Sequence, residues 1–142
     1  MGERPHKDLK AWQQAMTLAE ATYHMTEGFP RGERFGLIAQ MRRAATSVPT
    51  NIAEGCARQS VRETLQFYFV ARGSLSELDT LAELSYRVRF CTAEVYERLH
   101  RHIIGDVSSL LQGLIRHNRK HASAGLVSIT QLRNYPITDA LQ

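Results

Sequence analysis

The residues of this chain that are suited to chemistry are mostly cations, and the chemistry they favour is the binding of phosphate groups. The 142 residues carry a formal net charge of +4, and arginine forks form paired hydrogen bonds with phosphate oxygens. Phosphate contacts of this kind are weakly sequence-selective and sensitive to salt. The alternative is an ordinary solvated surface with cations placed favourably at a helix C-terminus. The residues expected to contact nucleic acid are Arg31, Arg34, Arg58, Arg98, Arg101, Arg116, Arg119 and Lys120.

Metal and catalytic sites are not predicted. His117 and His121 stand four residues apart, a spacing that allows a metal to be held from one helical face, but no third ligand or His-Glu-x-x-His pattern accompanies them. A di-iron bundle needs a Glu-x-x-His motif on two helices, and the four expected helices contain this spacing once, at Glu97 and His100. No phosphate loop, nucleophile elbow or Cys–His pair is present in the sequence. We therefore expect a protein that is not an enzyme, with no cofactor and no metal.

Arg72 lies at the flank of an apolar helical stripe. A buried guanidinium must be paired, because removing a lone charge from water costs several kcal/mol. The sequence offers Asp79, Glu77 and Glu54 as partners, so we expect a structural polar network that fixes the register of the helices. A phosphate or ligand site within the bundle is the alternative for Arg72. Glu77 has the second option of pairing across a subunit interface.

The segment 40–55 separates into an apolar and a polar face at the period of an α-helix. Arg43, Asn51 and Glu54 lie on the polar face. We expect Arg43 to pair with Glu54 or to bind an anion. Asn51 is expected to satisfy backbone groups that Pro49 leaves without a partner. These residues complete the predicted polar network.

Helices must position all of these side chains. Apolar residues recur at helical spacing over about 7–26, 33–58, 60–89 and 92–121, with Ser60 and Thr92 as N-caps. Short loops between four helices predict an all-α, up-down-up-down antiparallel four-helix bundle over residues 1–121. Residues 122–142 lose the helical period and are expected to form a tail or an arm that docks on a neighbour.

Apolar surface on the last two expected helices exceeds what one core needs. Phe69, Val70, Ile104 and Leu111 broaden the inward stripes of these helices. The excess predicts a homo-oligomer with a buried interface. The alternative is a thick core that is filled by the kinked second helix.

Cysteine use and hydropathy bear on location. Cys56 and Cys91 are isolated, and no signal peptide is recognisable, so we expect free thiols in the cytoplasm. No apolar run approaches the length that a membrane span requires.

Several ordered motifs resemble a known family. They are KDLKAWQ at 7–13, FGL at 35–37, QMRRAA at 40–45, SVPTNIAEG at 47–55 and FYFVARGSLSEL at 67–78. In this order and spacing they resemble the four-helix-bundle family whose founding members are encoded in intervening sequences of bacterial 23S ribosomal RNA genes. The resemblance covers roughly residues 6–120. It implies an up-down helical bundle and a ring-shaped homopentamer.

The resemblance also implies partners. A relative of the family, the accessory variability determinant of diversity-generating retroelements, is a basic pentameric bundle that binds a reverse transcriptase and nucleic acid. We therefore expect a homo-oligomeric nucleic-acid-binding or scaffold module, whose nucleic-acid partner is RNA, for example a structured RNA, or DNA. A protein-interaction adaptor, for a reverse transcriptase or a ribosomal component and without direct nucleic-acid contact, is the alternative.

Overall fold

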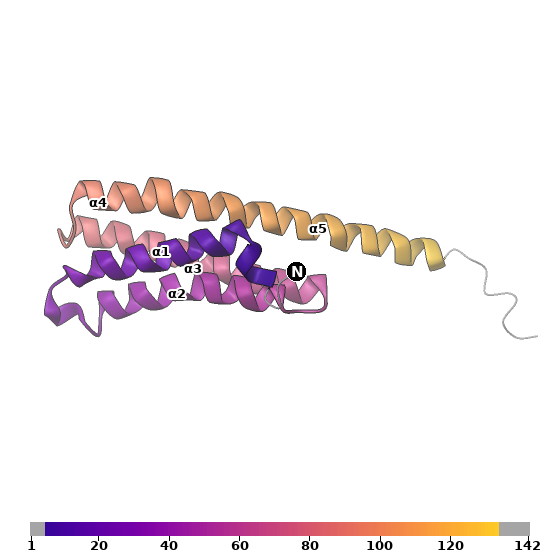
Figure 1. Ribbon diagram of the computed structural model, residues 1–142, viewed down its shortest axis with the longest axis horizontal. Helices are drawn as coiled ribbons and strands as arrows, with labels where there is room; N and C mark the ends of the chain where they lie inside the picture. The colour runs from indigo at the N-terminus through magenta and orange to yellow at the C-terminus, as the bar shows by residue number, and fades with distance from the viewer. Residues whose placement is uncertain (1–4, 134–142) are drawn as a thin grey trace, which may run out of the picture.

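The protein is all-helical over the part of the chain that the structure describes (Figure 1). The structure is a computed structural model; it describes the backbone of residues 5–133 and the side-chain surroundings of residues 5–122. Its elements are η1 (Pro5–Asp8), α1 (Lys10–Glu27), η2 (Arg31–Glu33), α2 (Leu37–Cys56), α3 (Val61–Arg87), α4 (Ala93–Glu97), η3 (Arg98–Ile104) and α5 (Gly105–Arg133). The short elements η1 and η2 are 3-10 turns, whereas η3 is a π-helix. The predicted all-α class is confirmed.

The elements form four antiparallel rods, because α4, η3 and α5 continue one another in a single line (Figure 1). The α1–α2 and α3–α4 turns lie at one end of the bundle, which we call the α4 end. The element η1 and the α2–α3 turn lie at the other, the α2–α3 end. The predicted up-down-up-down bundle is therefore confirmed.

Side-chain caps start the two helices for which the sequence predicted them. The hydroxyl of Ser60 accepts a hydrogen bond from the backbone N–H of Glu63 at 3.2 Å, and that of Thr92 accepts one from Val95 at 3.3 Å. Each cap satisfies one of the amides that the first turn of a helix leaves without a partner. The start of α3, where the candidate site lies, is therefore fixed by its own sequence.

The core joins α2 and α3 most closely near the α2–α3 turn. A Cβ atom added to Gly55 would lie 2.7 Å from the ring of Tyr68, so only glycine permits this approach. The Thr64 hydroxyl donates to the carbonyl of Gly55 at 2.8 Å. Further along, Met41, Ile52 and Leu78 are fully buried. These contacts hold the first half of α3 rigidly against α2.

The π-helix η3 changes which side chains of the last rod face the core. After Leu99 the next buried apolar residue is Ile104, five positions later, and Leu111 and Ile115 follow it inward at helical spacing. A π-turn contains one extra residue, so it shifts the apolar stripe by one position. The prediction that Ile104 and Leu111 add apolar surface outside the core is therefore wrong. Val70, by contrast, is 52% exposed, which leaves part of the expected surface excess on α3.

The last helix is longer than its apolar pattern predicted. It continues past the expected end at His121 to Arg133 and extends beyond the other rods (Figure 1). The predicted tail, residues 122–142, therefore begins inside a helix. The remainder of that predicted segment, 134–142, lies outside the described residues.

Candidate nucleic-acid interface

Arginine side chains lie on phenylalanine rings along the first half of α3. The guanidinium carbon of Arg58, in the α2–α3 turn, lies 4.5 Å from the centre of the Phe67 ring. Phe69 is approached by two arginines, Arg72 at 5.0 Å and Arg119 of α5 at 5.3 Å. We call these five residues the arginine–phenylalanine cluster. Guanidinium groups within about 6 Å of a ring centre are attracted by its π-face, so the rings position the cations.

The guanidinium groups of the cluster have no acidic partner among the described residues. The ion pairs found there join Arg87 to Glu83, His100 to Asp79 and Arg101 to Glu97. All three cluster arginines are exposed. A ring holds a guanidinium through its face and leaves its N–H groups available, so these arginines can donate to the oxygens of a phosphate.

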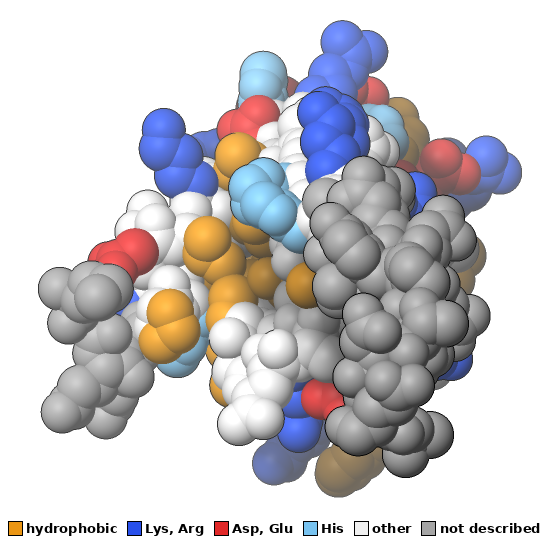
Figure 2. Space-filling view, turned by 90° about the vertical axis from the view of Figure 1, so that its right-hand side faces the viewer, with side chains coloured by type: hydrophobic (Ala, Val, Ile, Leu, Met, Phe, Trp, Pro, Cys, Tyr) orange, Lys and Arg blue, Asp and Glu red, His pale blue; other side chains and the backbone are white. Residues whose placement is uncertain are grey.

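The predicted nucleic-acid residues do not form one surface. Arg31 and Arg34 lie at the α4 end, in or beside η2, as do Arg98 and Arg101 of η3 (Figure 1). Arg58 lies at the α2–α3 end, and α5 carries the remaining three, Arg116, Arg119 and Lys120, around its middle. Viewed from the α2–α3 end, basic side chains project from the margin around an exposed apolar hollow (Figure 2). The structure thus separates the predicted set into two groups and brings together only part of it.

Arg72 is not part of a buried network, so that prediction is wrong. The side chain is exposed and reaches over Phe69, and within the described residues it makes no ion pair with Asp79, Glu77 or Glu54. Its position follows Ala71 on the edge of the buried stripe, and a long side chain at such an edge extends to water while its stem covers apolar surface. The guanidinium therefore avoids the cost of burial without an acidic partner.

The other members of the predicted network also make different contacts. The amide of Asn51 donates to the carbonyl of Ser47 at 2.7 Å, whereas the carbonyl that Pro49 leaves without an amide is that of Ala45. Asn51 thus satisfies a backbone carbonyl two residues before Pro49, but not that of Ala45. Residues Arg43, Glu54 and Glu77 are exposed and have no ion pair in the described part of the chain. The expected pairing of Arg43 with Glu54 is not formed.

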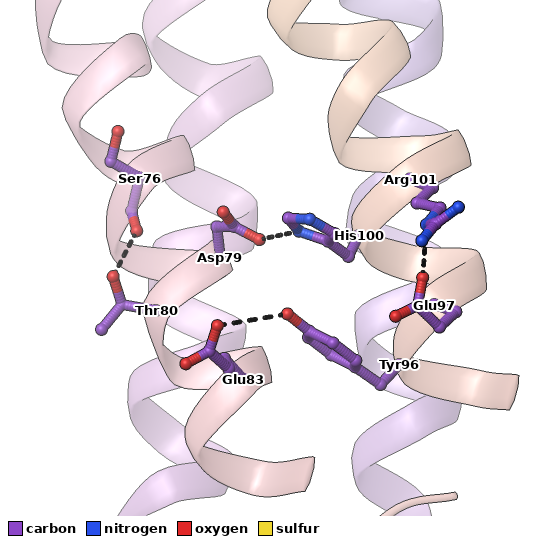
Figure 3. Close-up of polar contacts among 8 residues, drawn as sticks. All are labelled: Ser76, Asp79, Thr80, Glu83, Tyr96, Glu97, His100 and Arg101. Atoms are coloured by element: carbon purple, nitrogen blue, oxygen red, sulfur yellow. Dashed lines mark hydrogen bonds and ion pairs between the residues drawn. The ribbon is translucent and has the colours of Figure 1, made fainter. Parts of the chain in front are cut away.

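Asp79 instead belongs to a polar cluster near the α4 end (Figure 3). Its carboxylate lies 2.6 Å from Nδ1 of His100, and the hydroxyl of Tyr96 lies 3.5 Å from a carboxylate oxygen of Glu83. Tyr96 is stacked between His100, with ring centres 5.4 Å apart, and Tyr86, at 5.2 Å. These contacts tie α3 to α4 and η3.

The polar cluster around Asp79, Glu83 and Tyr96 carries carboxylates, whereas the arginine–phenylalanine cluster carries cations. Burial raises the pKa of Tyr96, and the carboxylates of Glu83, Asp79 and Glu97 raise it further. Negative charge near a phenol disfavours the phenolate, and it also repels phosphate. Within the described residues, the side-chain hydrogen bond that His100 makes is the one to Asp79.

Exposed apolar residues mark two further surfaces. On α3 and just beyond it, Val70, Leu84 and Val88 are between 46% and 52% exposed. Between α1 and the α4–η3 segment lies a groove of about 440 Å³, and its apolar lining includes Met25 and Ile103. Both surfaces are suited to protein contacts.

Sequence reasoning missed the role of the two phenylalanines. Phe69 counted only as excess apolar surface, and Arg72 was expected to pair with an acid or to bind a phosphate or ligand, not to lie on a ring. The available signal was the Phe69–Arg72 spacing of three, which places the two side chains on one face of a helix. The contribution of Arg119 depends on how α5 packs against α3, which no local pattern contains.

Within the described residues, no helix combines the length and apolar character that crossing a membrane requires.

No curated protein matches the chain. A solved structure from Bacteroides thetaiotaomicron, a protein of unknown function from the S23 ribosomal protein family, superposes with a TM-score of 0.66. It is 22% identical and covers 74% of this chain and 97% of its own length, so it supports the fold alone. The family model for the 23S rRNA-intervening sequence protein matches residues 7–113, well over half of the chain, and the chain therefore belongs to that family.

Proposed function

We propose that the chain is a non-enzymatic, homo-oligomeric helical bundle that binds nucleic acid, with structured RNA favoured over DNA. The observation that carries this proposal is the pair Arg72 and Arg119, two exposed guanidinium groups from different helices on the single ring of Phe69, with no described acidic partner. Cations that are held in place and not neutralised suit a phosphate backbone. Membership of a family described by an rRNA intervening sequence is consistent with an RNA partner.

Self-assembly is the second element of the proposal. Apolar residues such as Val70 and Leu84 remain about half exposed on α3, and their burial between copies would favour association. The family resemblance points to a ring of five. Assembly also multiplies the net charge of +4, which strengthens phosphate binding. Light scattering should give a mass well above the 16.1 kDa of one chain; a monomer would contradict the proposal.

The binding test compares two double variants that remove the same charge. Arg72→Ala with Arg119→Ala removes unpaired cations, whereas Arg87→Ala with Arg101→Ala removes cations that are paired with Glu83 and Glu97. In fluorescence anisotropy with a structured RNA, we expect the first variant to lose roughly tenfold to a hundredfold in affinity, and the second to lose much less. The affinity of the unmodified chain should fall steeply as salt increases. Equal losses in both variants would contradict the assignment of the interface.

A protein adaptor is the second candidate, because the groove between α1 and the α4–η3 segment has an apolar lining that suits a protein partner. A reverse transcriptase or a ribosomal component would be bound without direct nucleic-acid contact. Capture that does not weaken with salt and survives nuclease treatment would favour this function. The two free thiols, Cys56 and Cys91, fit a cytoplasmic location for either function.

A further inference from the structure

Two histidine side chains converge on the exposed face of α5. His117 and His121 are one helical turn apart, and their Nε2 atoms lie 3.1 Å from each other. The ring centres are 4.4 Å apart and the ring planes meet at 71°. Both residues are exposed. The two outer ring nitrogens therefore lie close together on a part of the helix that solvent can reach.

The separation of the nitrogens matches the requirement of a chelated metal ion. Zinc is bound by imidazole nitrogen at about 2.0–2.1 Å. An ion at that distance from both Nε2 atoms, which are 3.1 Å apart, would subtend an N–metal–N angle of roughly 95–100°. This value lies between the angles of octahedral and tetrahedral coordination. The geometry points to a two-histidine site for a divalent transition metal ion on α5, a function separate from nucleic-acid binding.

The ligand set determines which ions fit. Imidazole suits Zn²⁺, Ni²⁺ and Cu²⁺, whereas Mg²⁺ and Ca²⁺ require oxygen ligands. In the part of the chain whose side chains are described, no group of three or more histidine, cysteine, aspartate or glutamate residues could hold a metal. Water would complete the coordination of an ion held by His117 and His121. The cations Arg116 and Lys120 adjoin the pair in sequence and lower its affinity for a positive ion.

The sequence contained the spacing but not the geometry. A spacing of four permits chelation, yet it does not fix the ring rotamers, and without a third ligand the pattern alone predicted no metal. The convergence of the two nitrogens is the added observation. A neutral pair sharing one hydrogen bond has the same separation, so the experiment must detect the ion itself.

Titration calorimetry of the tag-free full chain with Zn²⁺ alone tests the proposal. We expect one ion per chain to bind the unmodified protein. His117→Ala should weaken binding by roughly tenfold to a hundredfold, because the second ligand of a chelate acts at high effective concentration. The matched control exchanges two neighbours, His121→Ala with Ala122→His. It keeps the composition but changes the histidine spacing from four to five, so it should weaken binding to the same extent.

A second readout guards against misfolded variants. Ions that bind only the native helix raise its melting temperature, so Zn²⁺ should raise the melting temperature of the unmodified chain and not that of the exchanged variant. Circular dichroism without metal confirms that each variant is helical. Equal Zn²⁺ affinity in all three proteins, or absence of binding to the unmodified chain, would overturn the site. Neither result bears on RNA binding, which is measured without metal.

Discussion

The two halves of α3 treat charge in opposite ways. In the first half, around Phe67–Arg72, cations lie on aromatic rings and have no described acidic partner. In the second half, around Asp79–Arg87, every described ion pair of the helix is found, and Tyr86, Tyr96 and His100 form a stack beside them. The first half is joined to α2 by close apolar contact, and the second is joined to α4 and η3 by polar contacts.

The difference shows that a binding surface is located by cations whose N–H groups are free to contact a ligand, more than by the number of cations. A guanidinium beside a carboxylate contributes little net positive charge, so Arg87 and Arg101 are weak candidates for phosphate contact. A guanidinium on a ring keeps its full charge and its donors while it loses part of its freedom. The net charge of +4 could not distinguish these two situations.

The largest expected effect comes from filling the close contact that anchors the first half of α3. Gly55→Ala places a Cβ 2.7 Å from the buried ring of Tyr68, which must move within a packed core. Overpacking costs about 1–3 kcal/mol and exceeds the gain of replacing a helical glycine, so we expect a net loss of about 1–2 kcal/mol in the free energy of unfolding. Denaturant unfolding measures it.

The matched control is the same substitution at the exposed face of α3. A Cβ added to Gly73 meets nothing within 4 Å. Gly73→Ala should therefore stabilise the chain by roughly 0.5–1 kcal/mol through helix propensity and the entropy of the unfolded state. Similar effects at both positions would show that the two helices do not approach as closely as described.

A smaller effect is expected when the ring of Phe69 is removed without a change of charge. Phe69→Leu keeps an apolar side chain but no longer orients Arg72 and Arg119. Because each exposed cation–π contact contributes about 0.5–1 kcal/mol, RNA affinity should fall about threefold to tenfold. The parallel change in the second half, Tyr86→Leu, removes an exposed ring that stacks on Tyr96 and should leave RNA affinity unchanged. A larger loss of RNA affinity for Tyr86→Leu than for Phe69→Leu would show that the interface lies on the second half of α3 and not on the first.

Local sequence signals predicted the elements and the topology. Apolar spacing located the four rods, and Ser60 and Thr92 marked the starts of α3 and α4 because capping depends on residues three positions apart. Pro49 lies inside α2 without ending it, and the apolar face of the segment 40–55 continues past it to Ile52.

Local sequence signals could not predict the contacts between helices. The pairing of Asp79 with His100 and the approach of Arg119 to Phe69 depend on how the rods are set against one another. The π-helix η3 has no simple sequence signature, yet its extra residue decides that Ile104 and not Ile103 is buried. Errors in the predicted interface residues followed from that one shift.

The smallest expected effect is a change of tyrosine pKa values with salt. It distinguishes the physical causes that raise the pKa of Tyr68 and that of Tyr96. Tyr68, in the first half of α3, has its pKa raised chiefly by burial and secondarily by the adjacent thiol of Cys56. Burial also raises the pKa of Tyr96, but there the carboxylates of Glu83 and Asp79 add to it. A raised folded-state pKa means that the stability contribution is present below pH of about 10 and is lost as pH rises toward the folded-state value.

Salt distinguishes the two phenols, because ions screen partly exposed carboxylates far more than they change burial. Phenolate absorbance of the unmodified chain, compared with Tyr68→Phe and Tyr96→Phe, isolates each titration. Added salt should lower the pKa of Tyr96 and leave that of Tyr68 in place, and Tyr96→Phe should lessen the loss of stability at alkaline pH. If salt moved both pKa values equally, the carboxylates of the second half would not act on Tyr96. The two halves of α3 would then not differ in the way proposed, with apolar packing around Tyr68 in the first half and charged groups around Tyr96 in the second.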